Sequence, residues 1–104
     1  MRILLIGTNK GNVHPEETRG TLRDLQGYVD GYIESVFIPQ LNEQGVALIV
    51  NEEGVIRALP LNENLYPFFF CGQAFMVGVK GSAFRGLTDN QLAFCQSWIS
   101  GLQD

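Results

Sequence analysis

The chain has 104 residues, which is the size of one domain, and we expect a single globular domain over residues 1–104. Hydrophobic residues make up 45% and charged residues only 17%, which excludes a disordered chain and favours exposed apolar surface for self-association or a partner. The net charge is −4 and the 7 basic residues are scattered from Arg2 to Arg85, which argues against binding to the phosphate backbone of nucleic acids.

The first expected element is a strand at Arg2–Ile6, because its continuous apolar run is typical of a strand covered on both faces. This run is too short for a signal peptide, and no apolar stretch reaches the ~20 residues of a membrane span, so we expect a cytoplasmic protein with no membrane segment.

The loop Gly7–Asn12 lacks the lysine of a phosphate-binding loop and is interpreted as a turn. Residues 13–20 resemble a polar strand, which Pro15 would confine to a sheet edge, and His14 is expected to be a surface residue.

A first helix is predicted over about residues 21–30. Thr21 can cap it, Asp24 takes the place of the acidic residue of a capping box, and Gly31 marks its end. Apolar residues recur on one face of this helix, at Leu22, Leu25, Tyr28 and Val29.

The centre of the predicted sheet is a strand over residues 32–38. Alternation places Glu34 on the same face as Tyr32, Val36 and Ile38. A carboxylate among apolar neighbours needs a partner or a place at the rim, since an unpaired buried charge costs several kcal/mol. We expect Arg57 or Arg2 to pair with it, and a ligand contact is the alternative.

A hairpin is predicted over residues 46–57, with Asn51–Gly54 as a type I turn closed by Gly54 in the left-handed conformation. This register would place Val50 opposite Ile56 and Ile49 opposite Arg57. Glu52 and Glu53 would then lie at an exposed tip, where a carboxylate is poorly suited to acid–base catalysis.

The segment after the hairpin is a connection through Asn62 to Pro67 and is a plausible functional surface, because loops carry binding groups. Phe68, Phe69 and Phe70 are interpreted as core residues or, if exposed, as a partner surface. A strand is expected over residues 73–79.

The last element is a helix over about residues 88–102, where Thr88 and Gln91 match a capping box. The elements together predict an α+β fold: a two-layer sandwich with an antiparallel or mixed sheet of four to six strands and both helices on one face.

The sequence predicts no metal site, no cofactor and no catalytic set. Cys71 and Cys95 lie in apolar surroundings, and a single histidine leaves too few ligands for zinc. His14 is the only conventional base for a cysteine nucleophile, and its loop position makes that pairing improbable.

Five short motifs occur in a fixed order along the chain. They are TLxxLQ at 21–26, GYIE at 31–34, NEEG at 51–54, LPxN at 59–62 and LTDxQ at 87–91. The series resembles an uncharacterised family, a domain of unknown function, found in small proteins of bacterial mobile elements and phages. The resemblance implies a mobile-element setting, in which small proteins often bind host proteins, and this binding is an analogy from the setting. The family has no established activity or catalytic residues to carry over to this chain.

These observations leave three functions to compare. We expect a non-enzymatic module that binds a protein partner or forms a homodimer, with a partner surface drawn from Tyr32, Glu34, Arg57, Asn62, Phe68, Phe69 and Phe70. The alternative is a small-ligand-binding protein or minor enzyme that uses Glu34 and neighbouring polar residues. Nucleic-acid binding is disfavoured by charge.

Overall fold

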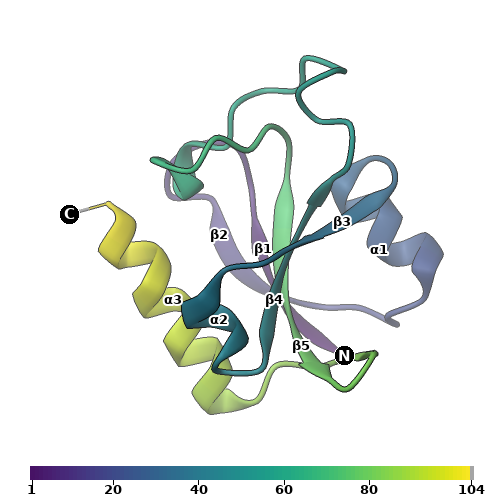
Figure 1. The fold of residues 1–104 in the computed structure, drawn as a ribbon, viewed down its shortest axis with the longest axis vertical. Helices are drawn as coiled ribbons and strands as arrows, with labels where there is room; N and C mark the ends of the chain where they lie inside the picture. The colour runs from purple at the N-terminus through teal and green to yellow at the C-terminus, as the bar shows by residue number, and fades with distance from the viewer. Residues whose placement is uncertain (104) are drawn as a thin grey trace.

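The computed structural model describes residues 1–103 and contains one antiparallel sheet. Its six strands are β1 (Arg2–Ile6), β2 (Val13–Glu17), β3 (Ile33–Val36), β4 (Val46–Asn51), β5 (Ala74–Lys80) and β6 (Ala83–Arg85). The order across the sheet is β2-β1-β5-β4-β3, and β6 pairs with the second half of β5. The helices are α1 (Leu22–Val29), α2 (Pro39–Asn42), α3 (Asp89–Leu102) and the 3-10 helix η1 (Glu63–Leu65), as Figure 1 shows.

Each face of the sheet is covered by a different long helix. On one face, Leu4 of β1 belongs to a core that includes Ile99 of α3. On the other face, Ile3 of β1 belongs to a core that includes Leu25 of α1. Figure 1 accordingly shows α1 and α3 on opposite sides of the strands. The sheet is therefore the middle layer of three.

The α+β class, the antiparallel sheet and the two long helices are confirmed, but the prediction that both helices cover one face is wrong. The central strands require cover on both sides: all six residues of β4 are buried, and so are the first five of β5. Burial on both faces is usual for parallel sheets and is found here in an antiparallel one. The continuous apolar run of β1 was the signal for it.

Both predicted helix caps are present. At α1 the Asp24 N–H donates to Thr21 Oγ1 (3.2 Å), and at α3 the Thr88 and Gln91 side chains form the complete capping box. Arg19 also forms two hydrogen bonds of 3.0 Å to the Asp24 carboxylate. These hydrogen bonds lower the pKa of Asp24 below its ordinary value.

The predicted hairpin over residues 46–57 is wrong. β4 ends at Asn51, and residues 52–58 form turns without a strand. β4 pairs instead with β3 and β5, so that Val50 lies opposite Glu34 and Ile49 lies opposite Ser35. The two apolar residues expected in the second hairpin strand, Val55 and Ile56, are 62% and 85% exposed.

Three short elements complete the fold: β2, α2 and β6. β2 lies at a sheet edge and contains Pro15, as predicted. The helical turn α2 begins with Pro39 at its first position, where the fixed φ and the missing N–H of proline are tolerated. β6 lies between Gly81 and Gly86, after the strand that was expected over residues 73–79. Over residues 1–103, no helix has the length and apolar character needed to cross a membrane.

Candidate functional site

The loop after β4 begins at a buried asparagine. Asn51 is 4% exposed, and its Nδ2 donates to the carbonyl oxygens of Val29 (2.8 Å) and Asp30 (3.2 Å). Its Oδ1 accepts the Glu53 N–H at 2.7 Å. A buried amide that uses both its donor and its acceptor fixes the groups it bonds, because breaking these bonds inside the protein is costly. Asn51 thus ties the end of α1 to the start of the loop.

The loop itself is one helical turn closed by a Schellman motif. The Ala58 N–H donates to Val55 O and the Leu59 N–H donates to Gly54 O, both at 3.0 Å. Ala58 takes the left-handed conformation that ends such a turn, with φ of 54°. These bonds fix the backbone of the turn, from which the exposed side chains of Val55 and Ile56 project into solvent.

The loop packs directly on the aromatic segment that follows η1. A Cβ atom added to Gly54 would lie 2.3 Å from Cys71 O. Gly54 does not have the left-handed φ that the hairpin prediction required. Its role is the close approach of two backbone segments, which only glycine permits.

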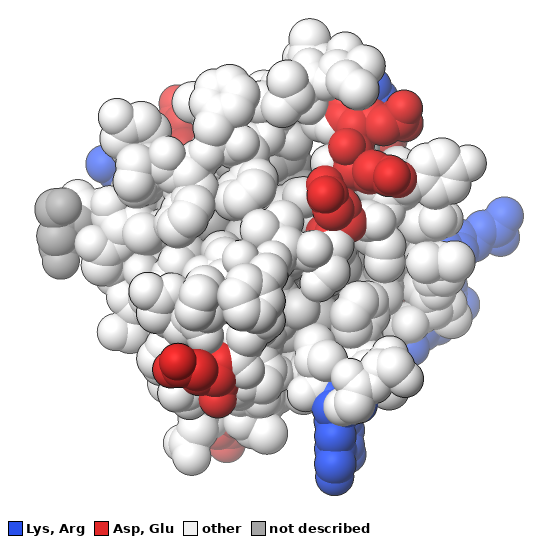
Figure 2. Space-filling model, viewed as in Figure 1, with Lys and Arg blue, Asp and Glu red and all other residues white. Residues whose placement is uncertain are grey.

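These segments enclose a cleft of about 320 Å³ between the start of β3, the end of β4, the loop and residues 69–71. We call it the Glu34 groove. Its side chains include two carboxylates and four large apolar groups: Glu34, Glu52, Val55, Ile56, Phe69 and Phe70. Figure 2 shows acidic side chains gathered over the start of β3 and the loop after β4. The groove therefore combines negative charge with exposed apolar surface.

The structure brings three of the predicted surface residues, Glu34, Phe69 and Phe70, together in the groove. Tyr32 lies next to it, because its carbonyl oxygen accepts the Glu52 N–H at 2.9 Å and its side chain is 64% exposed. Phe68 does not line the groove: its ring stacks on Phe70, with centroids 6.1 Å apart, and is tilted by 30° against Trp98 of α3 at 5.7 Å.

The expected ion pair of Glu34 with an arginine is not formed. Arg57 donates to the carbonyl oxygen of Asp30 and pairs with the Asp30 carboxylate at 3.1 Å. Arg2 pairs with Asp89 at 2.8 Å. Glu34 does not need a buried partner, because it lies exposed at the sheet edge.

Asn62 lies inside the protein and not on an exposed surface. It is 0% exposed, and its Nδ2 donates to Ile6 O (3.1 Å) and Gly72 O (3.0 Å). The neighbouring Asn64 does the same for the loop after β1, by donating to Gly7 O at 2.7 Å. These asparagines hold the backbone of adjacent loops in place. Sequence reasoning missed this role because a polar residue in a loop pattern gives no sign of burial.

The cysteines and the histidine do not meet. Cys71 is half-buried at the groove, whereas Cys95 is buried among apolar groups of α3, where desolvation raises the pKa of its thiol to about 12. His14 lies on β2, at the sheet edge opposite to β3. A cysteine–histidine pair is therefore not available. Within residues 1–103, no group of three His, Cys, Asp or Glu side chains is placed to hold a metal ion.

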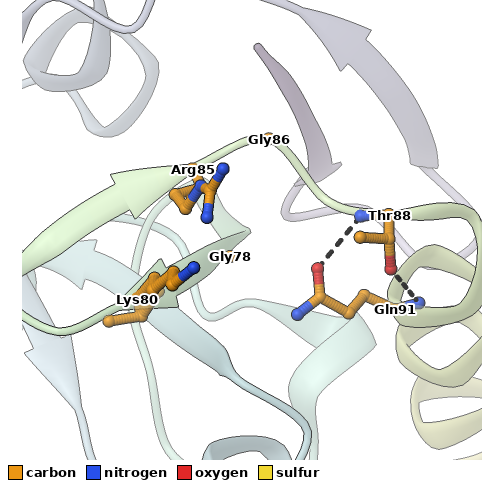
Figure 3. Close-up of a pocket in the computed structure, with 7 residues that line it drawn as sticks. Gly78, Lys80, Arg85, Gly86, Thr88 and Gln91 are labelled. Carbon is orange, nitrogen blue, oxygen red and sulfur yellow. Dashed lines mark hydrogen bonds between the residues drawn. The ribbon is translucent and has the colours of Figure 1, made fainter.

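A second cavity, of about 380 Å³, lies at the other end of β5, and we call it the Lys80 pocket. Lys80 and Arg85 lie on one side of it and the start of α3 lies on the other, as Figure 3 shows. The helix start offers little to an anion, because two of its backbone N–H groups are already bonded to side chains. The Thr88 N–H donates to Gln91 Oε1 at 3.0 Å, and the Gln91 N–H donates to Thr88 Oγ1 at 3.1 Å. Beside Gly78 the pocket is lined by backbone carbonyl oxygens: a Cβ atom added to Gly78 would lie 2.9 Å from Arg85 O and 3.2 Å from Gly86 O.

The chain as a whole matches a family model. Residues 1–100 match the model described as Domain of unknown function (DUF3846). The chain belongs to this family. No curated protein and no solved structure matches it. The Glu34 groove and the Lys80 pocket both lie within the DUF3846 domain, since the match extends from β1 into α3.

Proposed function

We propose that this DUF3846 protein is a non-enzymatic protein-binding module and that the Glu34 groove receives its partner. The observation that carries the proposal is the exposure of large apolar side chains at a formed cleft: Ile56 is 85% and Phe69 is 69% exposed. Clustered exposed apolar groups are characteristic of interaction sites, and aromatic side chains contribute much of the binding energy at interfaces.

The charge of the groove defines the chemistry of the partner. Glu34 and Glu52 line the groove, and the nearby Arg57 is already engaged by Asp30. A segment that places Lys or Arg beside an aliphatic or aromatic residue would satisfy both components of the surface. Complementary charge also accelerates association with a basic partner and disfavours an acidic one.

The setting of this partner follows from the motif series. The order of TLxxLQ, GYIE, NEEG, LPxN and LTDxQ resembles proteins of bacterial mobile elements and phages. On that resemblance the partner is a host protein of the bacterial cytoplasm.

A small-ligand site is the second candidate, and the cleft beside Glu34 favours it. Its volume of about 320 Å³ falls at the lower end of the range of small-molecule pockets, about 300–1,000 Å³. The exposure of Glu34 is unfavourable to a catalytic role, because acid–base catalysis depends on positioned and usually desolvated carboxyl groups.

The experiment is selection of short random peptides on the purified protein, followed by calorimetric titration of the selected sequences. We expect the selected peptides to carry Lys or Arg next to an apolar residue. The double variant Glu34→Gln, Glu52→Gln should bind them roughly tenfold more weakly, a change of about 1.4 kcal/mol. Phe69→Ser should weaken binding by at least as much, because an exposed aromatic anchor would be lost.

Two variants serve as matched controls. Glu43→Gln removes one negative charge at the exposed end of α2, outside the groove, and its effect is compared with half of the effect of the double variant, which removes two. Leu22→Ser removes another exposed apolar side chain, 59% exposed, at the start of α1. Equal effects of the groove and control variants would contradict the proposal. A small compound that raises the melting temperature and blocks no peptide would favour the second candidate.

A further inference from the structure

The two edges of the sheet differ in whether another strand can add to them. The Thr18 N–H donates to Met1 O at 2.8 Å, so these two residues form a hydrogen-bonded pair. Hydrogen-bonded and non-hydrogen-bonded pairs alternate along an antiparallel ladder, so the Pro15–Leu4 pair is of the second kind and the backbone groups of Pro15 face away from β1. The free edge of β2 therefore lacks one donor, and His14, Glu16 and Glu17 surround the gap. Proline and charge are the usual means by which an edge strand resists pairing.

The free edge of β3 lacks proline, and its one charged side chain is the exposed Glu34. The Glu52 N–H donates to Tyr32 O, so the backbone groups of Ile33 and Ser35 face outward along this ladder. The strand contains no proline or lysine, and Ser35 is exposed. Tyr32 and Phe37 flank the strand and are 64% and 73% exposed.

We propose that the β3 edge pairs with the β3 edge of a second copy of this chain, in antiparallel orientation about a two-fold axis through Ser35. In this register Ser35 exchanges backbone hydrogen bonds with Ser35 of the second copy. Ile33 pairs with Phe37 of the second copy, which covers the exposed ring with an apolar side chain on the same face. Ile33 and Ser35 face outward along the ladder, and Phe37 follows one residue after the end of β3 at the next position of the same alternation. Positions 33 and 37 are symmetric about residue 35, so the edge is complementary to itself.

Charge selects this register over its neighbour. A shift that pairs Ile33 with Ser35 of the second copy would put the two Glu34 side chains directly opposite each other, which is destabilising. The register centred on Ser35 places Glu34 opposite Val36 of the second copy and leaves the two carboxylates on a diagonal of about 7–8 Å. Some repulsion remains, so salt should strengthen the dimer.

The dimer would place two Glu34 grooves on one face of a continuous sheet, since Glu34 and Val36 lie on the α3 face in both copies. Two linked grooves raise the apparent affinity for a partner that offers two basic segments. Pairing through the edge does not require an occupied groove, so this inference stands independently of the proposed function.

The test is sedimentation equilibrium of the purified full chain over a range of about 10 μM to 1 mM. These high concentrations are needed because an interface formed by a few edge residues buries less area than the ~1,200 Å² of a stable interface. We expect a reversible dimer with a dissociation constant on the order of 100 μM. Raising the salt from about 0.01 M to about 1 M should strengthen it roughly two- to fivefold, and Glu34→Gln should remove much of that dependence. A chain that stays monomeric over this range overturns the proposal.

Ser35→Pro locates the interface. The Ser35 amide faces outward, so proline there removes no hydrogen bond to β4 and should leave the monomer folded, whereas the dimer should disappear. Ser35→Ala is the control and should still dimerise. A folded Ser35→Pro variant that dimerises like the wild type overturns the proposal. If Ser35→Pro does not fold, hydrogen exchange of the wild-type Ser35 amide decides: slower exchange at high protein concentration supports the β3 edge, and unchanged exchange overturns it.

Discussion

The two ends of β5 carry cavities of similar size and opposite character. The Glu34 groove measures about 320 Å³ and the Lys80 pocket about 380 Å³. In the groove, large apolar side chains are exposed to solvent beside hydrated carboxylates. In the pocket, the polar groups at the start of α3 are already bonded to one another. Exposed apolar surface, and not volume, distinguishes the site that can gain most from a partner.

Each end also contains a glycine that permits close backbone contact, and replacement of these glycines tests how rigidly each cavity is built. Gly54→Ala should have the largest effect, because its Cβ would lie 2.3 Å from Cys71 O. We expect the free energy of unfolding to fall by about 3 kcal/mol, at the upper end of overpacking effects. Urea denaturation measures this change, and a variant as stable as the wild type would disprove the packing of the loop on Cys71.

Gly78→Ala makes the corresponding change at the Lys80 pocket. The nearest backbone atom to its Cβ would be Arg85 O, at the longer distance of 2.9 Å. We expect a loss of about 1–2 kcal/mol, because the short β6 strand can shift by part of the overlap. A greater loss than for Gly54→Ala, in the same denaturation experiment, would reverse the order of rigidity assigned to the two ends.

Gln91→Ala tests whether the amides at the start of α3 are already satisfied. This change removes the hydrogen bond to the Thr88 N–H and the bonds of Gln91 Nε2 to the carbonyl oxygens of Gln44 and Gly45. Loss of a cap costs ~1 kcal/mol, and we expect a thermal unfolding experiment to show a loss of that size. Gln96→Ala on the same helix, away from the cap, is the control and should have little effect.

Ala58→Gly should have the smallest effect and the opposite sign. Ala58 has a φ of 54°, which glycine adopts without the steric cost that a Cβ brings. We expect a gain of about 0.5–1 kcal/mol, reduced by the greater freedom of glycine in the unfolded chain. A loss of stability in thermal unfolding would contradict the Schellman closure of the loop beside the groove.

Most of the local structure could be predicted from the sequence, but little of the candidate site could. The caps at Thr21 and Thr88 are readable because their hydrogen bonds join residues three positions apart. The apolar run of β1 likewise indicates cover on both faces. Such signals are local, so the sequence is sufficient to interpret them.

The groove depends on long-range contacts that local patterns do not specify. Asn51-Glu52-Glu53-Gly54 has the composition of a hairpin turn, but Asn51 bonds the end of α1, 21 and 22 positions earlier, and Gly54 meets Cys71. Val55 and Ile56 resemble strand residues and are exposed, because β4 takes β3 and β5 as its neighbours. Glu34 alone was identified from alternation as an unusual carboxylate, and the cleft beside it could only be seen in the structure.

The most direct test of the binding site is a backbone amide shift map of the isotope-labelled protein, titrated with a peptide selected on it. We predict that the largest shifts occur at Glu34, at residues 52–56 and at residues 69–71, around the Glu34 groove. The residues of the Lys80 pocket, from Gly78 to Lys80 and from Arg85 to Gln91, should change little. A map centred on the Lys80 pocket, with the groove unaffected, would contradict the assignment of the Glu34 groove as the partner surface.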